Sequence, residues 1–183
     1  MILSYQITEQ DYFEYSYYTA WQAPWNKKKR FIYLLRTPLF GLLFIAILIY
    51  TIERKTPSSV ISSVLIFFLI YIVLLRIMIK DNFRRSARKI YNDPKNASLF
   101  SKAEMSFDKM GISAKDENSQ VHYNWSAVIK KETTQNLYLL YLSEITAVII
   151  PKRIFKLQSE KESFEKMLAE HLPLQADLPS VDK

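Results

Sequence analysis

Two long apolar runs lie close together in the first half of the chain, over Phe31–Ile52 and Val60–Ile79. A membrane's hydrocarbon core is about 30 Å thick, and a helix of about 20 residues crosses it. Because both runs reach that length and only a short polar loop separates them, the sequence predicts a transmembrane helical hairpin over residues 26–90. The alternative is a helical hairpin buried inside a globular protein, and the single charge within Val60–Ile79 argues against it.

Positive charge gathers around these runs. The chain has a net charge of +7. The basic residues that flank or enter the runs are Lys27, Lys28, Lys29, Arg30, Arg36, Arg76, Lys80, Arg84, Arg85, Arg88 and Lys89. Since Lys and Arg beside membrane spans stay on the cytoplasmic side, we expect a cell-membrane protein with two spans and both termini cytoplasmic. Its expected partner is the lipid bilayer, and charge that follows the spans argues against nucleic acid.

Two of these basic residues, Arg36 and Arg76, lie within the apolar runs. Both fall near the predicted cytoplasmic ends, so we expect their long side chains to reach the headgroups. An ion or proton pathway is the alternative, and it would need more polar residues deep in the spans.

Residues 1–25 are predicted to form a unit of their own, with a short strand over Ile2–Ile7 and a helix from about Glu9 to Gln22. Thr8–Asp11 resembles a capping box, with Asp in place of the usual Glu. The spacing of four between the aromatic residues Tyr17, Trp21 and Trp25 favours a helix at the membrane interface, where Tyr and Trp sit at headgroup level. Packing of these rings against a soluble domain stays open as the alternative.

Residues 96–173 are predicted to form a cytoplasmic domain of short strands and one helix. The expected strands are Ala103–Phe107, Ile112–Lys115, Gln120–Trp125, Ala127–Glu132, Leu137–Leu142 and Ile145–Ile150. Leu137–Leu142 is apolar on both faces, which predicts a central strand. A capping box at Ser159–Glu162 begins the helix and Pro173 ends it. Phe164, Met167, Leu168 and Leu172 share its apolar face.

The predicted fold class is therefore α+β: a transmembrane helical hairpin plus a small antiparallel-sheet domain capped by a C-terminal helix. Pleckstrin-homology-like (PH-like) domains have this order of strands and helix, so the domain is expected to be PH-like by fold analogy. The tail, residues 174–183, is expected to be disordered.

Several segments, taken in order, resemble one family. They are Tyr5–Tyr12 before the helical hairpin, Trp125 near a strand, Leu137–Leu142, and Ile149–Phe155 before the last helix. In this combination the chain resembles the YcxB-like proteins from about Tyr5 to Leu172. The resemblance implies a bacterial inner-membrane protein with a cytoplasmic C-terminal domain, and it implies no catalytic residue.

Motifs that carry chemistry are scarce. His122 and His171 have no Cys or second His nearby in sequence, which argues against a zinc site. The two glycines, Gly41 and Gly111, are too few for a Gly-rich phosphate loop. We therefore predict no catalytic residue, no metal site and no cofactor, and we do not expect an enzyme.

Four basic residues of the soluble domain, Lys130, Lys131, Lys152 and Arg153, are candidates for contact with anionic headgroups. The alternative is ordinary solvated charge at strand ends. The predicted function is a membrane-anchored interaction module whose PH-like domain binds a protein partner or an anionic membrane surface. The alternative is an accessory subunit of a transport or stress-sensing membrane complex, paired with another protein or with copies of itself.

Overall fold

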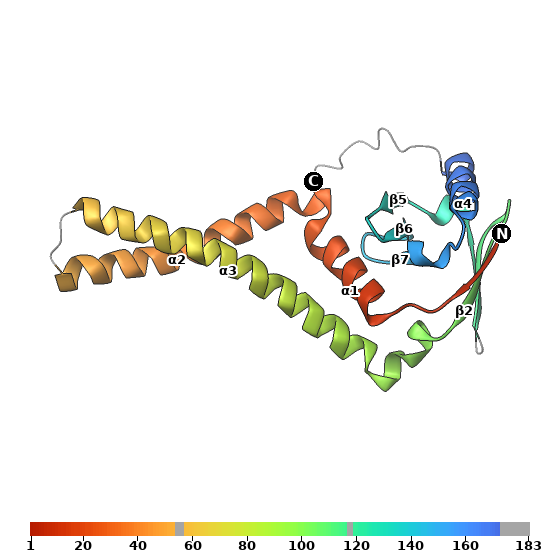
Figure 1. Ribbon diagram of the computed structural model, residues 1–183, viewed down its shortest axis with the longest axis horizontal. Coiled ribbons are helices and arrows are strands. Elements are labelled where there is room, and N and C mark those ends of the chain that lie inside the picture. The colour runs from red at the N-terminus through yellow and green to blue at the C-terminus, as the bar shows by residue number, and fades with distance from the viewer. Residues whose placement is uncertain (54–56, 117–118, 173–183) are drawn as a thin grey trace. The chain divides into compact units, whose positions relative to one another are not determined.

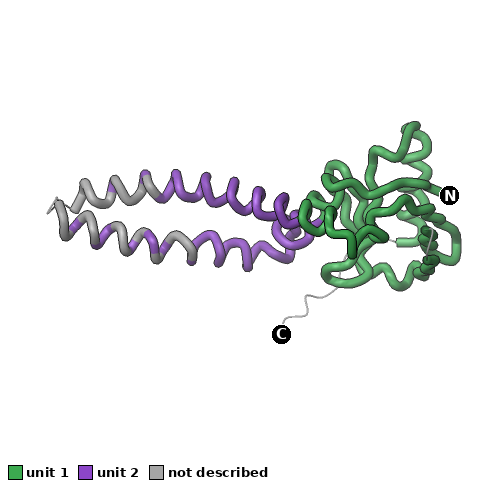
Figure 2. The backbone as a smooth tube through the Cα atoms, turned by 90° about the horizontal axis from the view of Figure 1, so that it is seen from below, with its two compact units in different colours: residues 1–15, 87–183 green, residues 16–86 purple. Residues whose placement is uncertain are grey.

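The computed structural model describes residues 1–53, 57–116 and 119–172, and gives side chains only in part within residues 37–67. The chain divides into two compact units (Figure 2). Unit 1 consists of Met1–Tyr15 and Ala87–Lys183, and unit 2 is Ser16–Ser86. The predicted tail at 174–183 lies outside the described residues.

Unit 1 holds two antiparallel sheets (Figure 1). The first has the order β1-β2-β3-β4, with β1 at Ile2–Tyr5, β2 at Ala103–Phe107, β3 at Gly111–Lys115 and β4 at Gln120–Asn124. The second has the order β5-β6-β7, with β5 at Lys130–Thr133, β6 at Leu137–Tyr141 and β7 at Ala147–Pro151. Helix α4, Gln158–His171, follows. The predicted α+β class with antiparallel strands is confirmed.

The N-terminal strand completes the first sheet. β1 pairs with β2 in a register that runs from Ile2↔Ser106 to Tyr5↔Ala103. The amino group of Met1 extends this pairing by donating to the Phe107 carbonyl at 2.7 Å. The sequence alone grouped residues 1–25 together, whereas in the structure residues 1–15 belong to the same unit as the sheets.

The central position predicted for Leu137–Leu142 is confirmed. β6 pairs with β5 on one side and β7 on the other, and all five of its residues are buried. A strand that has neighbours on both edges and packing on both faces needs apolar residues at every position. The sequence of β6, Leu-Tyr-Leu-Leu-Tyr, meets this requirement.

Helix α4 packs the predicted apolar face into the core. Phe164 and Leu168 are fully buried, and Met167 and Leu172 pack against the same core. The predicted capping box at Ser159–Glu162 is wrong, because the helix begins at Gln158. The Glu160 carboxylate instead accepts hydrogen bonds from the backbone N–H groups before the helix, at Lys156 (3.2 Å) and Leu157 (3.5 Å).

The β2–β3 turn requires glycine at its last position. The Asp108 side chain accepts from the N–H groups of Met110 (2.7 Å) and Gly111 (3.1 Å). Gly111 has a φ of +156°, and a Cβ there would lie 2.1 Å from the backbone oxygen of Tyr123 on β4. The close approach of β3 and β4 therefore leaves no space for a side chain.

We predict that Gly111→Ala lowers the free energy of unfolding by about 2 kcal/mol, because the clash forces strained backbone into the sheet. Urea unfolding of the full chain, followed by circular dichroism, measures the change. Gly41→Ala is the control, since a Cβ at Gly41 meets no heavy atom of the described residues within 4 Å and alanine favours a helix. Equal stability of Gly111→Ala and the wild type would contradict the prediction.

Unit 2 consists mainly of helices. α1, Glu9–Tyr17, begins in unit 1 and continues as a π-helical turn at Tyr18–Gln22, so the predicted helix to Gln22 is confirmed. A 3-10 turn at Pro24–Asn26 then leads into α2, Lys27–Glu53. α3 is Pro57–Tyr91, and its last residues return the chain to unit 1.

The predicted transmembrane hairpin is not supported. In the part of the chain that the structure describes, no helix combines the length and the apolar character that a membrane crossing requires. A crossing takes about 20 consecutive, predominantly apolar residues. Residues 54–56 and many side chains of both runs lie outside the described residues. The fold class is corrected to α+β with two long helices between β1 and β2.

Candidate functional site

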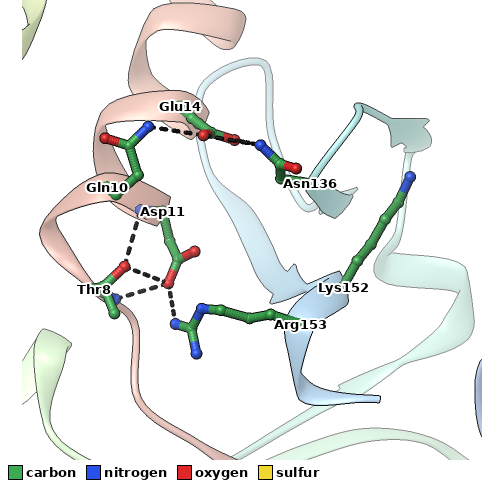
Figure 3. A pocket seen from close by; sticks show the side chains of 7 residues that line it. All are labelled: Thr8, Gln10, Asp11, Glu14, Asn136, Lys152 and Arg153. Carbon is green, nitrogen blue, oxygen red and sulfur yellow. Dashed lines mark hydrogen bonds and ion pairs between the residues drawn. The ribbon is translucent and has the colours of Figure 1, made fainter. Parts of the chain in front are cut away.

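Helix α1 is held to the second sheet by a polar network that lines a cavity of about 320 Å³ (Figure 3). The Asp11 carboxylate forms an ion pair with the Arg153 guanidinium, just after β7. The Glu14 carboxylate accepts from the Asn136 amide at 2.9 and 3.0 Å, and from Gln10 at 2.8 Å. These contacts join α1 to the loop before β6 and the turn after β7.

Asp11 also caps its own helix. Its Oδ2 accepts from the Thr8 backbone N–H and hydroxyl, each at 2.8 Å, while the Thr8 hydroxyl oxygen accepts from the Asp11 N–H at 3.2 Å. The capping box predicted at Thr8–Asp11 is therefore confirmed. Asp11 is buried, and its carboxylate is satisfied by these groups together with Arg153.

The two adjacent cations Lys152 and Arg153 point in different directions (Figure 3). Arg153 reaches Asp11 and also donates to the Gln6 carbonyl at 3.0 Å. Lys152 turns away from Asp11, donates to the Thr134 carbonyl, and lies 5.0 Å from the centre of the Tyr138 ring. Desolvation by burial lowers the pKa of Lys152, and the charge of Lys161 adds to this. This cavity thus holds balanced charges that fix α1 in place.

The N-terminal segment covers the outer edge of β7. The Tyr5 hydroxyl donates to the Ile149 carbonyl at 2.8 Å, and the Tyr15 hydroxyl donates to the Ile145 carbonyl. Burial raises the pKa of Tyr5, and the negative charge of Asp11 adds to the rise, so the phenol stays a donor. Pro151, the last residue of β7, has no N–H to offer. The chain itself therefore occupies part of this edge, at Ile149, and the loop before it, at Ile145.

The opposite edge of the sheet, along β5, is open among the described residues. The Thr134 N–H donates to the Leu137 carbonyl at 2.9 Å, which marks these residues as a hydrogen-bonded antiparallel pair. Hydrogen-bonded pairs recur at every second residue. In the β5–β6 register, the next hydrogen-bonded pairs are Glu132 with Leu139 and Lys130 with Tyr141. The backbone N–H and C=O groups of Lys131 and Thr133 therefore point away from β6, toward the open edge.

A second cavity, of about 210 Å³, lies beside this edge. We call it the β5 groove, and it is lined by Lys131, Thr133, Tyr138, Glu165 and Leu168. The Tyr138 hydroxyl donates to the Glu165 carboxylate, which links β6 to α4. Burial raises the pKa of Tyr138, and the hydrogen bond to Glu165 and its negative charge raise it further. Among the described residues, no ion pair involves Lys131.

The four residues predicted to contact headgroups do not form one cluster. Lys130 pairs with Glu132 at 2.7 Å, on the face of β5 opposite to Lys131. Lys131 lines the β5 groove, whereas Lys152 and Arg153 line the cavity at α1. Successive residues of a strand point to opposite faces, which separates Lys130 from Lys131. Contact of these four residues with headgroups stays a prediction.

The predicted interfacial aromatic residues pack within unit 2. Tyr17 contacts the Phe83 ring (5.4 Å between ring centres), Trp21 contacts Tyr33 (5.6 Å), and Trp25 contacts Tyr18 (6.3 Å). Nothing tests their predicted place at a membrane interface, which stays a prediction.

The basic residues of unit 2 are mostly exposed. Arg30 is an exception, since it donates to the carbonyls of Trp21 (3.0 Å) and Gln22 (2.9 Å) at the end of the π-helical turn. Arg85 pairs with Asp81 at 2.6 Å, one helical turn away. The side chains of Lys27, Lys28, Lys29, Arg36, Arg76, Lys80 and Arg84 are exposed, and so are those of Arg88 and Lys89, which belong to unit 1.

Residues that sequence reasoning missed make up most of both cavities. Glu14 and Asn136 meet across a separation of 122 residues, and Tyr138 meets Glu165 across 27. No local pattern marks such pairs. Within the described residues no group of His, Asp and Glu side chains is arranged to hold a metal ion.

Comparison with protein families finds a known family that matches part of the chain. The model of the YcxB-like protein family matches residues 107–168. This segment is YcxB-like. The resemblance drawn from the sequence is thereby confirmed for the segment, which is shorter than the expected range from Tyr5 to Leu172. Comparison with curated proteins and with solved structures found no match, so the likeness to PH-like domains stays a fold analogy.

The two cavities differ in how much of their lining lies within the YcxB-like segment. Every residue that lines the β5 groove lies within it, from Lys131 to Leu168. The cavity at α1 is completed by residues 8–14, which lie outside the matched segment. The β5 groove is therefore built by the matched segment alone.

Proposed function

We propose that unit 1 is a protein-interaction module and that it binds its partner at the β5 groove. One observation carries the proposal: the Tyr5 hydroxyl occupies the Ile149 carbonyl at the β7 edge of the second sheet, while among the described residues the β5 edge keeps outward backbone groups beside a cavity. Unpaired edge strands are templates for pairing with another chain. An edge left open next to a cavity suits recognition of a protein.

A protein partner fits the arrangement better than an anionic surface. Attraction to such a surface needs several free cations that face the same way, each contributing about 1 kcal/mol. Lys130 is paired with Glu132, Lys152 contacts Thr134 and Tyr138, and Arg153 is bound to Asp11. Three of the four candidate basic residues are thus engaged in internal contacts.

Site-specific photocrosslinking tests the proposal. A photoreactive phenylalanine replaces Lys131 in the full chain, expressed in the cells from which the chain comes, and a second variant carries it at the exposed Glu104 of β2. We expect a light-dependent adduct of defined mass at position 131 and none at position 104. The absence of an adduct at 131, or the same adducts at both positions, would refute this function.

Vesicle binding separates the protein from the lipid interpretation. The full chain and the Lys131→Ala variant are sedimented with neutral vesicles and with vesicles containing anionic lipid. Equal binding of both proteins to the two vesicle types is expected. Binding that needs anionic lipid and also needs Lys131 would show instead that the β5 groove faces a membrane surface.

A second candidate function concerns unit 2. Many described apolar side chains of α2 and α3 are exposed: Phe31, Leu39, Leu43, Ile47, Ile66, Leu69, Ile70, Val73 and Ile77. Exposed apolar patches of this kind mark association with another apolar surface. They favour the alternative role as a subunit of a larger complex. A photoreactive residue at Leu69 that gave no adduct in cells would count against this role.

A further inference from the structure

The β5 groove has features that identify the kind of partner segment it takes. Resting on the function proposed above, we infer that it binds an extended peptide, which adds a strand to the β5 edge and places an acidic side chain beside Lys131. The inference combines the backbone pairing of β5, the size of the cavity and the charges that line it.

The backbone of β5 supplies the first part of the argument. The alternation fixed by the Thr134–Leu137 hydrogen bond turns the N–H and C=O groups of Lys131 and Thr133 away from β6. An added strand satisfies these groups by ordinary sheet hydrogen bonds, which give affinity without regard to the peptide's side chains. The β7 edge differs, because the Tyr5 hydroxyl already binds the Ile149 carbonyl there and Pro151 lacks an N–H.

The cavity supplies the second part. Binding pockets for whole small molecules occupy about 300–1,000 Å³, whereas the β5 groove measures about 210 Å³. That volume suits one side chain of a bound strand. Alternate side chains of a strand point to the same face, so residues of the added strand in line with Lys131 and Thr133 direct their side chains toward α4.

The charges supply the third part. The groove contains one cation, Lys131, and one carboxylate, Glu165. Glu165 accepts the hydrogen bond from the Tyr138 hydroxyl, while among the described residues Lys131 has no ion-pair partner. An Asp or Glu side chain of the peptide therefore complements Lys131, whereas the carboxylate of Glu165 already accepts from Tyr138.

Peptide selection tests the inference with the full chain. A phage-displayed library of random 12-residue peptides is selected on the wild type, and the enriched peptides are synthesised and titrated by fluorescence anisotropy. We expect the selected peptides to share an Asp or Glu. Thr133→Pro removes an outward N–H at an edge, where proline is tolerated. It should weaken binding about tenfold or more, because a peptide carbonyl loses its donor.

His122→Pro is the matched control. The Asp116 N–H donates to the Ser119 carbonyl at 3.0 Å, so by the same alternation the backbone of His122 faces the open edge of β4. This variant deletes an equivalent outward donor on the other sheet and should leave peptide binding unchanged. Circular dichroism and thermal unfolding verify that both proline variants are folded.

Lys131→Glu provides a test that is independent of the proline variants. A library selected on Lys131→Glu should enrich Lys or Arg in place of Asp or Glu, since the charge in the groove is reversed. If the selected peptides bind Thr133→Pro as tightly as the wild type, or if Lys131→Glu enriches the same peptides, strand addition at β5 is refuted while protein binding elsewhere on unit 1 remains. If no peptide is enriched on the wild type and no crosslink forms at position 131, the proposed function fails as well.

Discussion

Phe164→Ala is expected to lower the free energy of unfolding of the full chain by about 4 kcal/mol, the cost of truncating a fully buried phenylalanine. Phe164 has no exposed surface, and its ring lies 5.2 Å from that of Phe107, 5.4 Å from Tyr138 and 5.1 Å from Phe155, measured between ring centres. Phe107 belongs to the first sheet and Tyr138 to the second. The ring therefore fills the space where the two sheets and α4 meet.

Urea unfolding followed by far-UV circular dichroism measures this loss. Lys166→Ala, on the exposed side of the same helix, is the control and should change the free energy of unfolding by less than about 0.5 kcal/mol. Phe164→Leu keeps most of the buried volume and should fall between the two. A loss below about 1 kcal/mol for Phe164→Ala would mean that α4 does not close the core as described.

Asp11→Ala is expected to cost about 3 kcal/mol, the second largest effect. The Asp11 carboxylate is buried and accepts from the Thr8 N–H, the Thr8 hydroxyl and the Arg153 guanidinium. Hydrogen bonds to a charged group contribute about 1.5–3 kcal/mol, and loss of helix capping adds about 1 kcal/mol. The Arg153 side chain is half exposed, so water screens its interaction with Asp11. The expected loss in the free energy of unfolding therefore lies near the lower end of the sum of these contributions.

The readout distinguishes this local role from a general loss of stability. Besides the urea titration, hydrogen exchange should accelerate in α1 and along β7 more than in β2 and β3, since Asp11 joins α1 to the end of β7. Gln10→Ala removes only the exposed hydrogen bond to Glu14 within α1, so it should lower the free energy of unfolding by less than about 0.5 kcal/mol and leave hydrogen exchange along β7 unchanged. Uniform acceleration across unit 1, or no change in α1, would contradict the assignment of Asp11 as the residue that holds the helix.

Local pattern predicted much of the secondary structure. The bounds expected for Ala103–Phe107 are those of β2, and the two-sided apolar strand at Leu137–Leu142 is the central β6. The capping box at Thr8–Asp11 formed as expected. These features depend on residues a few positions apart, and such neighbours interact in much the same way in any fold.

The sequence did not correctly predict what surrounds the two long helices or which residues line the candidate sites. The two apolar runs do form the long helices α2 and α3, but apolar periodicity does not by itself establish what covers a helix, and the described helices do not meet the requirements of a membrane span. The sequence named Lys152 and Arg153 together as candidates for headgroup contact. Their side chains point in different directions, Arg153 to Asp11 and Lys152 to Thr134, and the sequence does not show this.

By itself, the sequence determined which segments are strands and helices, which strand is central, and which face of α4 is apolar, because alternation and helical spacing record the burial of nearby side chains. Only the tertiary structure decided that β1 completes the first sheet, that the Tyr5 hydroxyl binds β7, and that the edge of β5 stays open among the described residues. Tyr5 lies 144 positions from Ile149, and the pairing of β1 with β2 joins segments similarly far apart in the sequence. These contacts are chosen by the packing of the whole core and by which backbone groups remain unpaired, and no local pattern carries that information.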